Sequence, residues 1–287
     1  MGALNLIIAH AQLADNLKDD LRTIPKNSMT TSSSAPVLHV HDGVATITLN
    51  RPAHRNRLEN EDLRTLLAHF EVVNHNLDVR VLVLTANTDG QPRPVFCAGY
   101  DIGGFSEADP HAVAFEQVPD ALAAIRPITI CALNGSVYGG ATDLVLACDL
   151  RLGLQGAEWR MPAAALGLHY YPSGLQRYLR LFGESAAKRA FLTARTFNTA
   201  QLAQLGIFEE FVAADDWRLT LDALIQDVNS LAPLAAQGTK KSLSELAAGH
   251  VDVQALADRQ HVTKLSADFA EGRKAFLERR KPVFTGQ

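Results

Sequence analysis

The first half of the chain alternates between short apolar runs and polar turns. In residues 37–50, apolar and polar positions alternate on both sides of a His-Asp-Gly sequence, which predicts a β-hairpin. Residues 79–86 form a nearly continuous run of β-branched and leucine residues, as in a strand that is buried on both faces. The segments PITICALNG (127–135) and LRLGLQ (150–155) predict two further strands.

Segments with helical spacing lie between these strands, at residues 58–76, 112–125 and 141–149. Strands that alternate with helices predict an α/β layered fold. After Pro172 nearly every segment favours a helix. We therefore expect a core over residues 37–200 and a helical region over residues 201–287.

Residues 1–36 differ from the rest of the chain. A short amphipathic segment is followed by SMTTSSSAP, which has the composition of a flexible linker. The acidic residues Asp15, Asp19 and Asp20 argue against an organelle transit peptide. We expect residues 1–28 to be an upstream extension and Met29 to be the natural start.

The composition argues against several classes of protein. The formal net charge of −4 over 287 residues is unlike the basic excess of a nucleic-acid binder. No apolar run approaches the ~20 residues that span a bilayer. Cys97, Cys131 and Cys148 are too scattered for a disulfide framework and lack metal-ligand spacing. We therefore predict a reducing compartment, the cytoplasm, and no metal site.

Residues 134–149, NGSVYGGATDLVLACD, place two adjacent glycines before an apolar helical segment that holds one acid, Asp143. A turn of this kind leaves backbone N–H groups unpaired, and glycine lets a ligand atom approach them closely. The arrangement is suited to holding an oxyanion, with Asp143 close by in the first helical turn. A glycine at an ordinary helix start, followed by an ordinary acid, explains the same residues.

Residues 95–105, VFCAGYDIGGF, pass in the same way from a strand into glycines. An oxyanion site usually needs two converging N–H donors. Two such turns, each following a buried strand, supply one donor each. This second transition favours the oxyanion interpretation.

With these motifs, the chain resembles the enoyl-CoA hydratase/isomerase (crotonase) family. The resemblance implies a spiral of ββα units to about residue 200, and then a helical region that forms trimers, or hexamers of two trimers. It also implies an acyl-coenzyme A substrate and no separate cofactor. The matching segments run in family order from residue 37 to residue 284: ITLNRPAHRN, VRVLVLTA, PVFCAGYDI, ALNGSVYGGATDLVLACDLRL, PAAALGLHYYPSGLQRYLRLFG, AQLGIFEEFV and EGRKAFLERRKPVF.

The resemblance also assigns catalytic positions. The backbone N–H groups of Tyr100 and Gly140 match the two donors to the thioester oxygen. Asp143 matches the first hydratase carboxylate, where the family usually has glutamate. The second carboxylate position, in PAAALG, is Ala163, which has no proton to give. Isomerisation, decarboxylation, carbon–carbon cleavage and thioester hydrolysis thus become as plausible as water addition.

The sequence LGLHYYPSG places three bulky residues where the family usually has a small proline-glycine turn. Histidine is a common acid/base side chain, so His169 is a candidate for the missing acid. Tyr170 and Tyr171 are suited to donate hydrogen bonds or to narrow the acyl pocket. All three are equally explained as residues that only line the pocket or a subunit contact.

Five residues match coenzyme-binding positions of the family. Arg51 and Arg55 resemble phosphate contacts, and the carbonyl of Ala98 resembles an acceptor for the adenine amino group. Lys281 and Phe284 lie in a motif that reaches the coenzyme of a neighbouring subunit. Simple solvated charge explains the three basic residues equally well. A catalytically silent CoA-ester binder or scaffold stays open beside the enzyme, whereas the acidic charge gives RNA binding no support.

Overall fold

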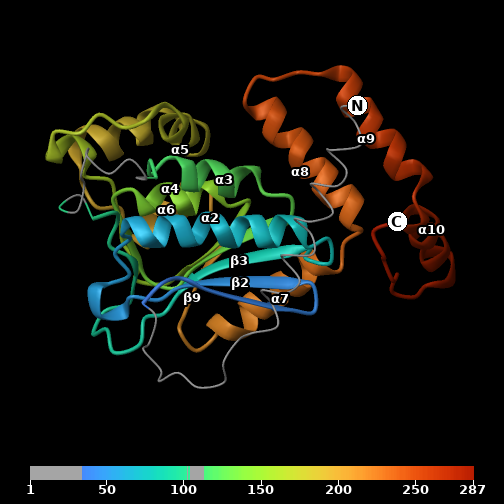
Figure 1. Ribbon diagram of the computed structural model, residues 1–287, viewed down its shortest axis with the longest axis horizontal. Helices are drawn as coiled ribbons and strands as arrows, with labels where there is room; N and C mark the ends of the chain where they lie inside the picture. Colours follow the sequence, from blue (N-terminus) through green and yellow to red (C-terminus); the bar gives the residue numbers. More distant parts are fainter. Residues whose placement is uncertain (1–33, 102, 104–112) are drawn as a thin grey trace, which may run out of the picture. The chain divides into compact units, whose positions relative to one another are not determined.

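The computed structural model describes residues 34–101, 103 and 113–287. Its larger sheet has six strands in the order β1-β2-β3-β5-β7-β9 (Figure 1). β1 is antiparallel to β2, and every other neighbouring pair is parallel. Of the N-terminal extension predicted over residues 1–36, all but residues 34–36 fall outside the described residues. The strands are β1 (Val37–His41), β2 (Val44–Leu49), β3 (Val81–Ala86), β5 (Ile128–Leu133), β7 (Leu150–Leu154) and β9 (Glu210–Val212).

The first two strands form the predicted hairpin. Asp42 and Gly43 connect them, and both have positive φ angles, of 46° and 78°. A two-residue turn with two positive φ angles matches the twist of the flanking strands, and glycine adopts it without strain. The local sequence therefore fixes the register, which pairs Val37 with Thr48.

The central strand β3 is buried on both faces, as predicted from its apolar run. Leu82 and Leu84 pack in the main hydrophobic core, whereas Val81 and Val83 belong to a second cluster on the other face of the sheet. Helix α7 (Trp217–Asn229) supplies partners for that second cluster, including Leu221. A strand between two apolar layers needs apolar residues at every position rather than at every second one.

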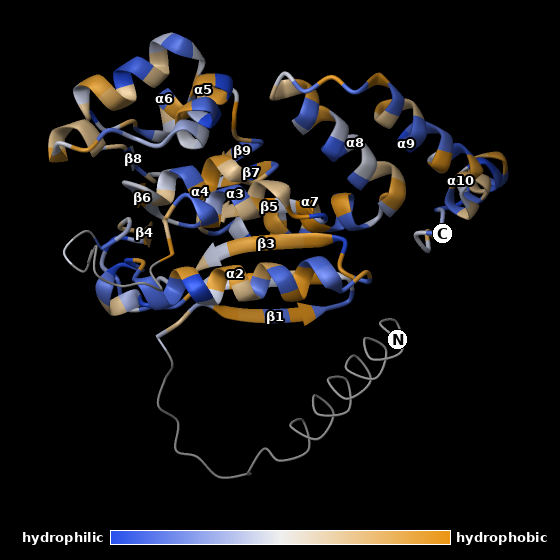
Figure 2. Cartoon of the chain, turned by 45° about the horizontal axis from the view of Figure 1, so that its top comes forward, coloured by the Kyte–Doolittle hydropathy of each residue, from blue (hydrophilic) through white to orange (hydrophobic). Residues whose placement is uncertain are grey.

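Helices cover the sheet and continue beyond it at the C-terminal end (Figure 2). The helices predicted over residues 58–76 and 141–149 are confirmed as α2 and α4, and the one predicted over residues 112–125 is shorter in the structure. The helices are α2 (Asn60–His75), α3 (Gln117–Ala124), α4 (Ala141–Ala147), α5 (Pro172–Thr193), α6 (Thr199–Ala203), α7 (Trp217–Asn229), α8 (Pro233–Ala247), α9 (Val253–Leu265) and α10 (Ala267–Glu278), with short 3-10 turns η2 (Pro52–His54) and η4 (Ala163–Leu166).

A second, smaller sheet consists of three short parallel strands, β4 (Val95–Cys97), β6 (Ser136–Tyr138) and β8 (Trp159–Arg160). Ser136–Tyr138, between the strand predicted over residues 127–135 and the two adjacent glycines, is a strand that was not predicted. Three residues between glycines are too few to show an alternation of apolar and polar positions, so the hydrophobic pattern does not predict β6. β6 matters because its pairing with β4 places the two glycine turns side by side.

The chain after residue 200 contributes to the main sheet as well as to the helical region. β9 pairs with β7, with Glu210 opposite Leu152. Beyond α7, the helices α8, α9 and α10 follow one another at one side of the sheet (Figure 1). Within the described residues, no helix is long and apolar enough to cross a membrane.

Candidate active site

The two glycine turns lie against each other at the ends of β4 and β6. Cys97 of β4 is paired with Val137 of β6, so both strands end at the same edge of the small sheet. A Cβ atom on Gly99 would lie 3.0 Å from the carbonyl oxygen of Tyr138, and the φ of Gly99 is 103°. A side chain at this position would therefore push the turns apart and strain the backbone.

Each turn carries one backbone N–H group that lies next to backbone groups already engaged in hydrogen bonds. Leu58 donates to the carbonyl of Gly99 and accepts from the N–H of Asp101, both at 2.9 Å, and these bonds flank the N–H of Tyr100. The N–H of Gly139 donates to Arg160. Within the described part of the chain, the N–H groups of Tyr100 and Gly140 donate no hydrogen bond. They are the two groups that the sequence singled out.

A chain of buried hydrogen bonds holds the second turn in place. Thr142 Oγ1 donates to the carbonyl of Gly139 at 2.7 Å, and Tyr178 Oη donates to Thr142 Oγ1 at 2.6 Å. Trp159 Nε1 donates in turn to Tyr178 Oη at 3.1 Å. These links tie the start of α4 to α5 and β8, so the turn is fixed by side chains from three elements.

Asp143, on α4, is fully buried and paired with Arg177 of α5. Arg177 Nε donates to Oδ1 at 2.8 Å and Nη2 donates to Oδ2 at 2.5 Å, which is a bidentate arrangement. Tyr171 Oη donates to Oδ2 at 2.6 Å. Arg177 Nη1 also donates to Asp120 of α3 at 2.8 Å. One arginine thus joins two carboxylates from two other helices.

The charges around Arg177 shift the pKa values of the groups beside it. Burial acts to lower the pKa of Arg177, but the hydrogen bonds and charges of Asp143 and Asp120 outweigh it and raise that pKa. Burial, the charge of Asp143 and the hydrogen bond to it all raise the pKa of Tyr171 well above its ordinary value. At neutral pH Arg177 is therefore charged and Tyr171 is protonated.

Aromatic side chains border the second turn. The ring of Phe115 lies against Gly140, where an added Cβ would be 2.8 Å from it. Its centroid is 5.6 Å from that of Tyr100 and 6.3 Å from that of Tyr171. These three rings bring together segments that are far apart in the sequence, and Phe115 was not among the residues that we predicted.

The sequence analysis also missed Arg177 and Asp120. One feature does point to Arg177, namely its position on an amphipathic helix. Helix α5 buries Gly174, Arg177 and Tyr178, so Arg177 lies on the apolar stripe of this helix. A charged residue on that stripe requires a buried partner of opposite charge. The signal indicates that a partner exists but does not identify it as Asp143.

Two other predicted catalytic positions lie nearby in the chain. Ala163, which the resemblance places at the second hydratase position, is buried at the start of η4. His169 is exposed, in the segment between η4 and α5. Among the described residues, no hydrogen bond or ion pair joins His169 to Asp143.

Arg55 and Ala98, two predicted coenzyme contacts, are adjacent in the structure. The N–H of Ala98 donates to the carbonyl of Arg55 at 2.9 Å, and both residues are exposed. Arg55 also borders a hollow of ≈ 740 Å³ together with Tyr138 and Glu158. Arg51 is in different surroundings, because it is paired with Asp62 and lies within 4.0 Å of Glu59 and Glu61.

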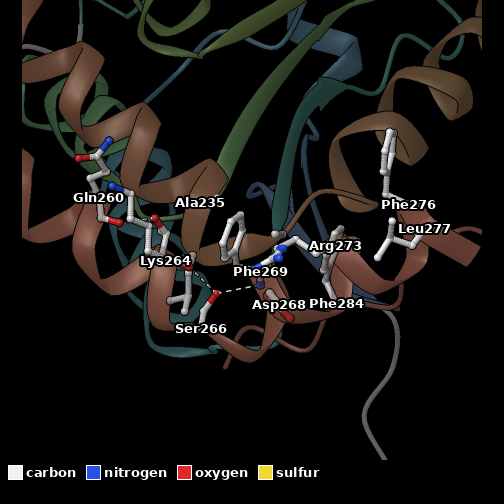
Figure 3. A pocket seen from close by; sticks show the side chains of 14 residues that line it. Ala235, Gln260, Lys264, Ser266, Asp268, Phe269, Arg273, Phe276, Leu277 and Phe284 are labelled. Atoms are coloured by element: carbon white, nitrogen blue, oxygen red, sulfur yellow. Dashed lines mark hydrogen bonds between the residues drawn. The ribbon is translucent and has the colours of Figure 1, made fainter.

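The two predicted contacts at the C-terminus lie beside α10. Lys281 is exposed, and the carbonyl of Phe284 accepts a 2.7 Å hydrogen bond from Arg80 Nη2. Phe284 lines a hollow of ≈ 670 Å³ between α8, α9 and α10, in which Phe269 and Arg273 lie close to it (Figure 3). Within the described residues, no three His, Cys, Asp or Glu side chains are grouped so as to hold a metal ion.

Comparisons with known proteins agree with this architecture. Residues 39–287 match the family model described as enoyl-CoA hydratase/isomerase. The chain is 31% identical to the 2,3-dehydroadipyl-CoA hydratase of Escherichia coli (strain K12), over 85% of this chain and 96% of that protein. It is 29% identical to a probable mitochondrial enoyl-CoA hydratase 2 of Arabidopsis thaliana, over 85% and 82% of the two chains.

Solved structures give the same result for the fold. A putative enoyl-CoA hydratase/isomerase family protein from Hyphomonas neptunium superposes with a TM-score of 0.81 at 25% identity, covering 90% of this chain and 100% of that one. An enoyl-CoA hydratase from Bacillus anthracis gives 0.80 at 26% identity, over 88% and 99%. The predicted fold class is thereby confirmed.

Proposed function

Since this chain belongs to the enoyl-CoA hydratase/isomerase family, we propose that it converts an acyl-coenzyme A thioester through an enolate. The observation that carries the proposal is the pair of unused N–H groups, of Tyr100 and Gly140, on two turns that lie in contact. Such donors stabilise the negative charge that develops on the thioester oxygen. Asp143, in the helix that follows Gly140, is the acid/base carboxylate of the site.

Coenzyme A enters this proposal as part of the substrate, with no further cofactor. Arg55 and Ala98 are its contacts, because they are exposed, adjacent and next to the turn that carries Tyr100. Arg51 supports this less well, since its guanidinium is already surrounded by three acidic side chains. Lys281, Phe284 and His169 stay predictions from the resemblance.

The reaction that we propose is proton transfer at the α-carbon rather than water addition. With Ala163 at the second carboxylate position, the family's second acid is missing. One carboxylate suffices to remove and return a proton beside a thioester. We expect little loss of enoyl absorbance from crotonyl-CoA, but exchange of the α-protons of butyryl-CoA in deuterated water.

A matched pair of substitutions tests the donor on the second turn. The φ of Gly140 is −56°, which proline also adopts, and proline removes the N–H. Gly140→Ala brings the same Cβ contact with Phe115 but keeps the N–H. We expect Gly140→Pro to exchange α-protons ~10²–10³-fold more slowly than Gly140→Ala, the usual effect of removing one such donor. Equal rates in the two variants would contradict the donor role.

Asp143→Asn tests the carboxylate. Asparagine has nearly the same shape and still accepts a hydrogen bond, but it cannot take up a proton. We expect α-proton exchange to be lost while butyryl-CoA still binds. Exchange at the wild-type rate in this variant would remove Asp143 from the mechanism.

A second candidate function is a silent CoA-ester-binding protein. Two observations favour it. Ala163 has no proton to give, and both carboxylate oxygens of Asp143 accept hydrogen bonds from Arg177. This candidate predicts binding of butyryl-CoA without any α-proton exchange. The exchange experiment on the wild-type protein therefore separates the two functions.

For the assembly, we propose a trimer or a hexamer of two trimers, with α10 in a subunit contact. Phe276 and Leu277 support this, since they are 83% and 79% exposed on α10 beside the C-terminal hollow. We expect light scattering to give the mass of three or six chains, and Phe276→Glu to lower it. Leu219→Glu, at a similarly exposed leucine on α7, serves as the control and should leave the mass unchanged.

A further inference from the structure

The Asp143 carboxylate is enclosed by its own partners. Its side chain is 0% exposed, Oδ1 accepts from Arg177 Nε, and Oδ2 accepts from both Arg177 Nη2 and Tyr171 Oη. A carboxylate in this position has no surface at which a substrate carbon can contact it. A proton that reaches Asp143 must pass through a group that already touches it.

Among the described residues, Arg177 and Tyr171 donate side-chain hydrogen bonds to Asp143, and of these two only the Tyr171 hydroxyl can give up one proton while it accepts another. Arg177 keeps its charge in proteins and cannot act as an acid or a base. Tyr171 is partly exposed, whereas Asp143 is not. The Tyr171 ring also neighbours Phe115, and Phe115 lies directly against Gly140. The Tyr171 hydroxyl thus contacts the buried carboxylate, while its ring neighbours the aromatic side chain that borders the second turn.

We propose that Tyr171 relays the proton between the α-carbon of the acyl group and Asp143, an inference that rests on the proposed function. In the forward step the α C–H bond breaks, and its proton binds Tyr171 Oη. At the same time the phenolic proton of Tyr171 passes to Asp143 Oδ2. The electron pair of the C–H bond enters the enolate, whose oxygen is held by the Tyr100 and Gly140 N–H groups. The reverse step protonates the enolate and restores the carboxylate.

The surroundings of Tyr171 favour a relay in which the Tyr171 side chain stays neutral throughout. Its raised pKa means that it does not ionise near neutral pH, and in the relay it gains one proton as it gives up another. Tyr170 Oη donates to Tyr171 Oη at 3.0 Å, and the two rings stack with centroids 4.2 Å apart. Arg177 acts as a positioning residue, since it holds the carboxylate that Tyr171 faces.

Exchange of the α-protons of butyryl-CoA in deuterated water tests the relay, with wild-type protein, Tyr171→Phe, Tyr170→Phe and Asp143→Asn compared at equal saturation. Tyr171→Phe keeps the ring and removes the hydroxyl. We expect it to slow exchange by at least ~10²-fold, the usual range for a general acid or base, with unchanged butyryl-CoA affinity. Tyr170→Phe should cause a smaller loss, because it removes only a hydrogen bond to Tyr171.

A second measurement on the wild-type protein does not depend on the folding of any variant. In a relay, an exchangeable proton moves from Tyr171 to Asp143 during abstraction, so release of an α-tritium label into the solvent should be slower in D₂O than in H₂O. Direct abstraction by Asp143 moves no exchangeable proton and gives equal rates in the two solvents.

The outcomes separate the relay from the proposed function. Exchange at the wild-type rate in Tyr171→Phe, together with its loss in Asp143→Asn, overturns the relay and leaves enolate chemistry in place. Equal label loss in the two solvents also overturns the relay. No exchange by the wild-type protein overturns the proposed function, and the relay with it.

Discussion

In the part of the chain that the structure describes, two buried arginine–aspartate pairs look alike but differ in what the carboxylate can do. Arg51 pairs with Asp62 at 2.8 Å, and Arg177 pairs with Asp143 at 2.5 Å. In both pairs the arginine side chain is about a tenth exposed or less, at 11% and 7%, and the aspartate is 1% or 0% exposed. Arg51 and Asp143 were both predicted site residues, so the comparison bears directly on function.

The two carboxylates differ in how their oxygens are bonded. Arg51 Nε and the N–H of Glu59 both donate to Oδ2 of Asp62, while Oδ1 is buried without a partner among the described residues. Burial accordingly raises the pKa of Asp62, against the hydrogen bond from Arg51, which lowers it. At Asp143, both oxygens accept hydrogen bonds from Arg177.

The two pairs also hold different parts of the molecule together. Asp62 lies in the first turn of α2 and takes part in a capping box with Glu59, so its pair with Arg51 fixes a loop to a helix start. Asp143 links α4 to α5 and also contacts the hydroxyl of Tyr171, a partly exposed residue. A buried ion pair is thus a structural element in one place and, in our proposal, part of a proton path in the other. The deciding feature is the third group on the carboxylate.

The largest expected effect is that of Arg177→Met. It leaves Asp143 buried without its counter-charge, and breaking a buried pair in this way costs about 3–5 kcal/mol of the free energy of unfolding. Urea denaturation measures the loss. Arg180→Met, at an exposed arginine one turn further along α5, is the control and should change stability by less than about 0.5 kcal/mol. Equal losses in the two variants would contradict the importance of the pair.

Arg51→Met should cost less, about 1–3 kcal/mol, the usual price of leaving a buried polar group unbonded. Asp62 already has a raised pKa, so taking up a proton relieves its isolated charge more easily. The same urea measurement, made beside Arg177→Met, checks the order. A loss as large as that of Arg177→Met would mean that the two pairs are equivalent.

Asp120→Asn should have a smaller effect, of about 0.5–1 kcal/mol. Asp120 accepts from Arg177 Nη1 and from Ser173 Oγ, but its side chain is 43% exposed, so water screens the pair. Thermal or urea unfolding measures the change. A loss of several kcal/mol would show that Arg177 depends on both carboxylates rather than chiefly on Asp143.

The smallest effect concerns the pH dependence at Asp62. Its folded-state pKa is raised above the ordinary value of 3.8, so the folded protein holds this proton to a higher pH than the unfolded chain. The stabilising contribution of Asp62 to the free energy of unfolding is fully present below pH 3.8, and it is lost as the pH rises through the folded-state pKa. The unfolding free energy of the wild type minus that of Asp62→Asn should therefore fall as the pH is raised from 3.8. A difference that rises or stays constant would contradict this assignment.

Much of the backbone followed from local sequence. The Asp42–Gly43 turn and the apolar run of β3 are confirmed. A turn with positive φ angles favours residues such as Asp-Gly, and a strand buried on both faces requires a continuous apolar run, so both are visible in the local sequence. The glycines at 99 and 139 identified two turns for the same reason. The sequence did not reveal β6, a strand of three residues, although its pairing with β4 brings those turns together.

The partners of the site carboxylate were decided by the tertiary structure alone. The sequence by itself determined that Asp143 follows a glycine turn, whereas the burial of Arg177 on α5 is a feature of the folded structure. Only the packing of α4 against α5 joins the two, across 34 positions of the chain, and the same packing turns Tyr171 onto the carboxylate. Turn and strand signals act between neighbouring residues, whereas the partner of a buried charge depends on which helices pack together, and no local pattern specifies that.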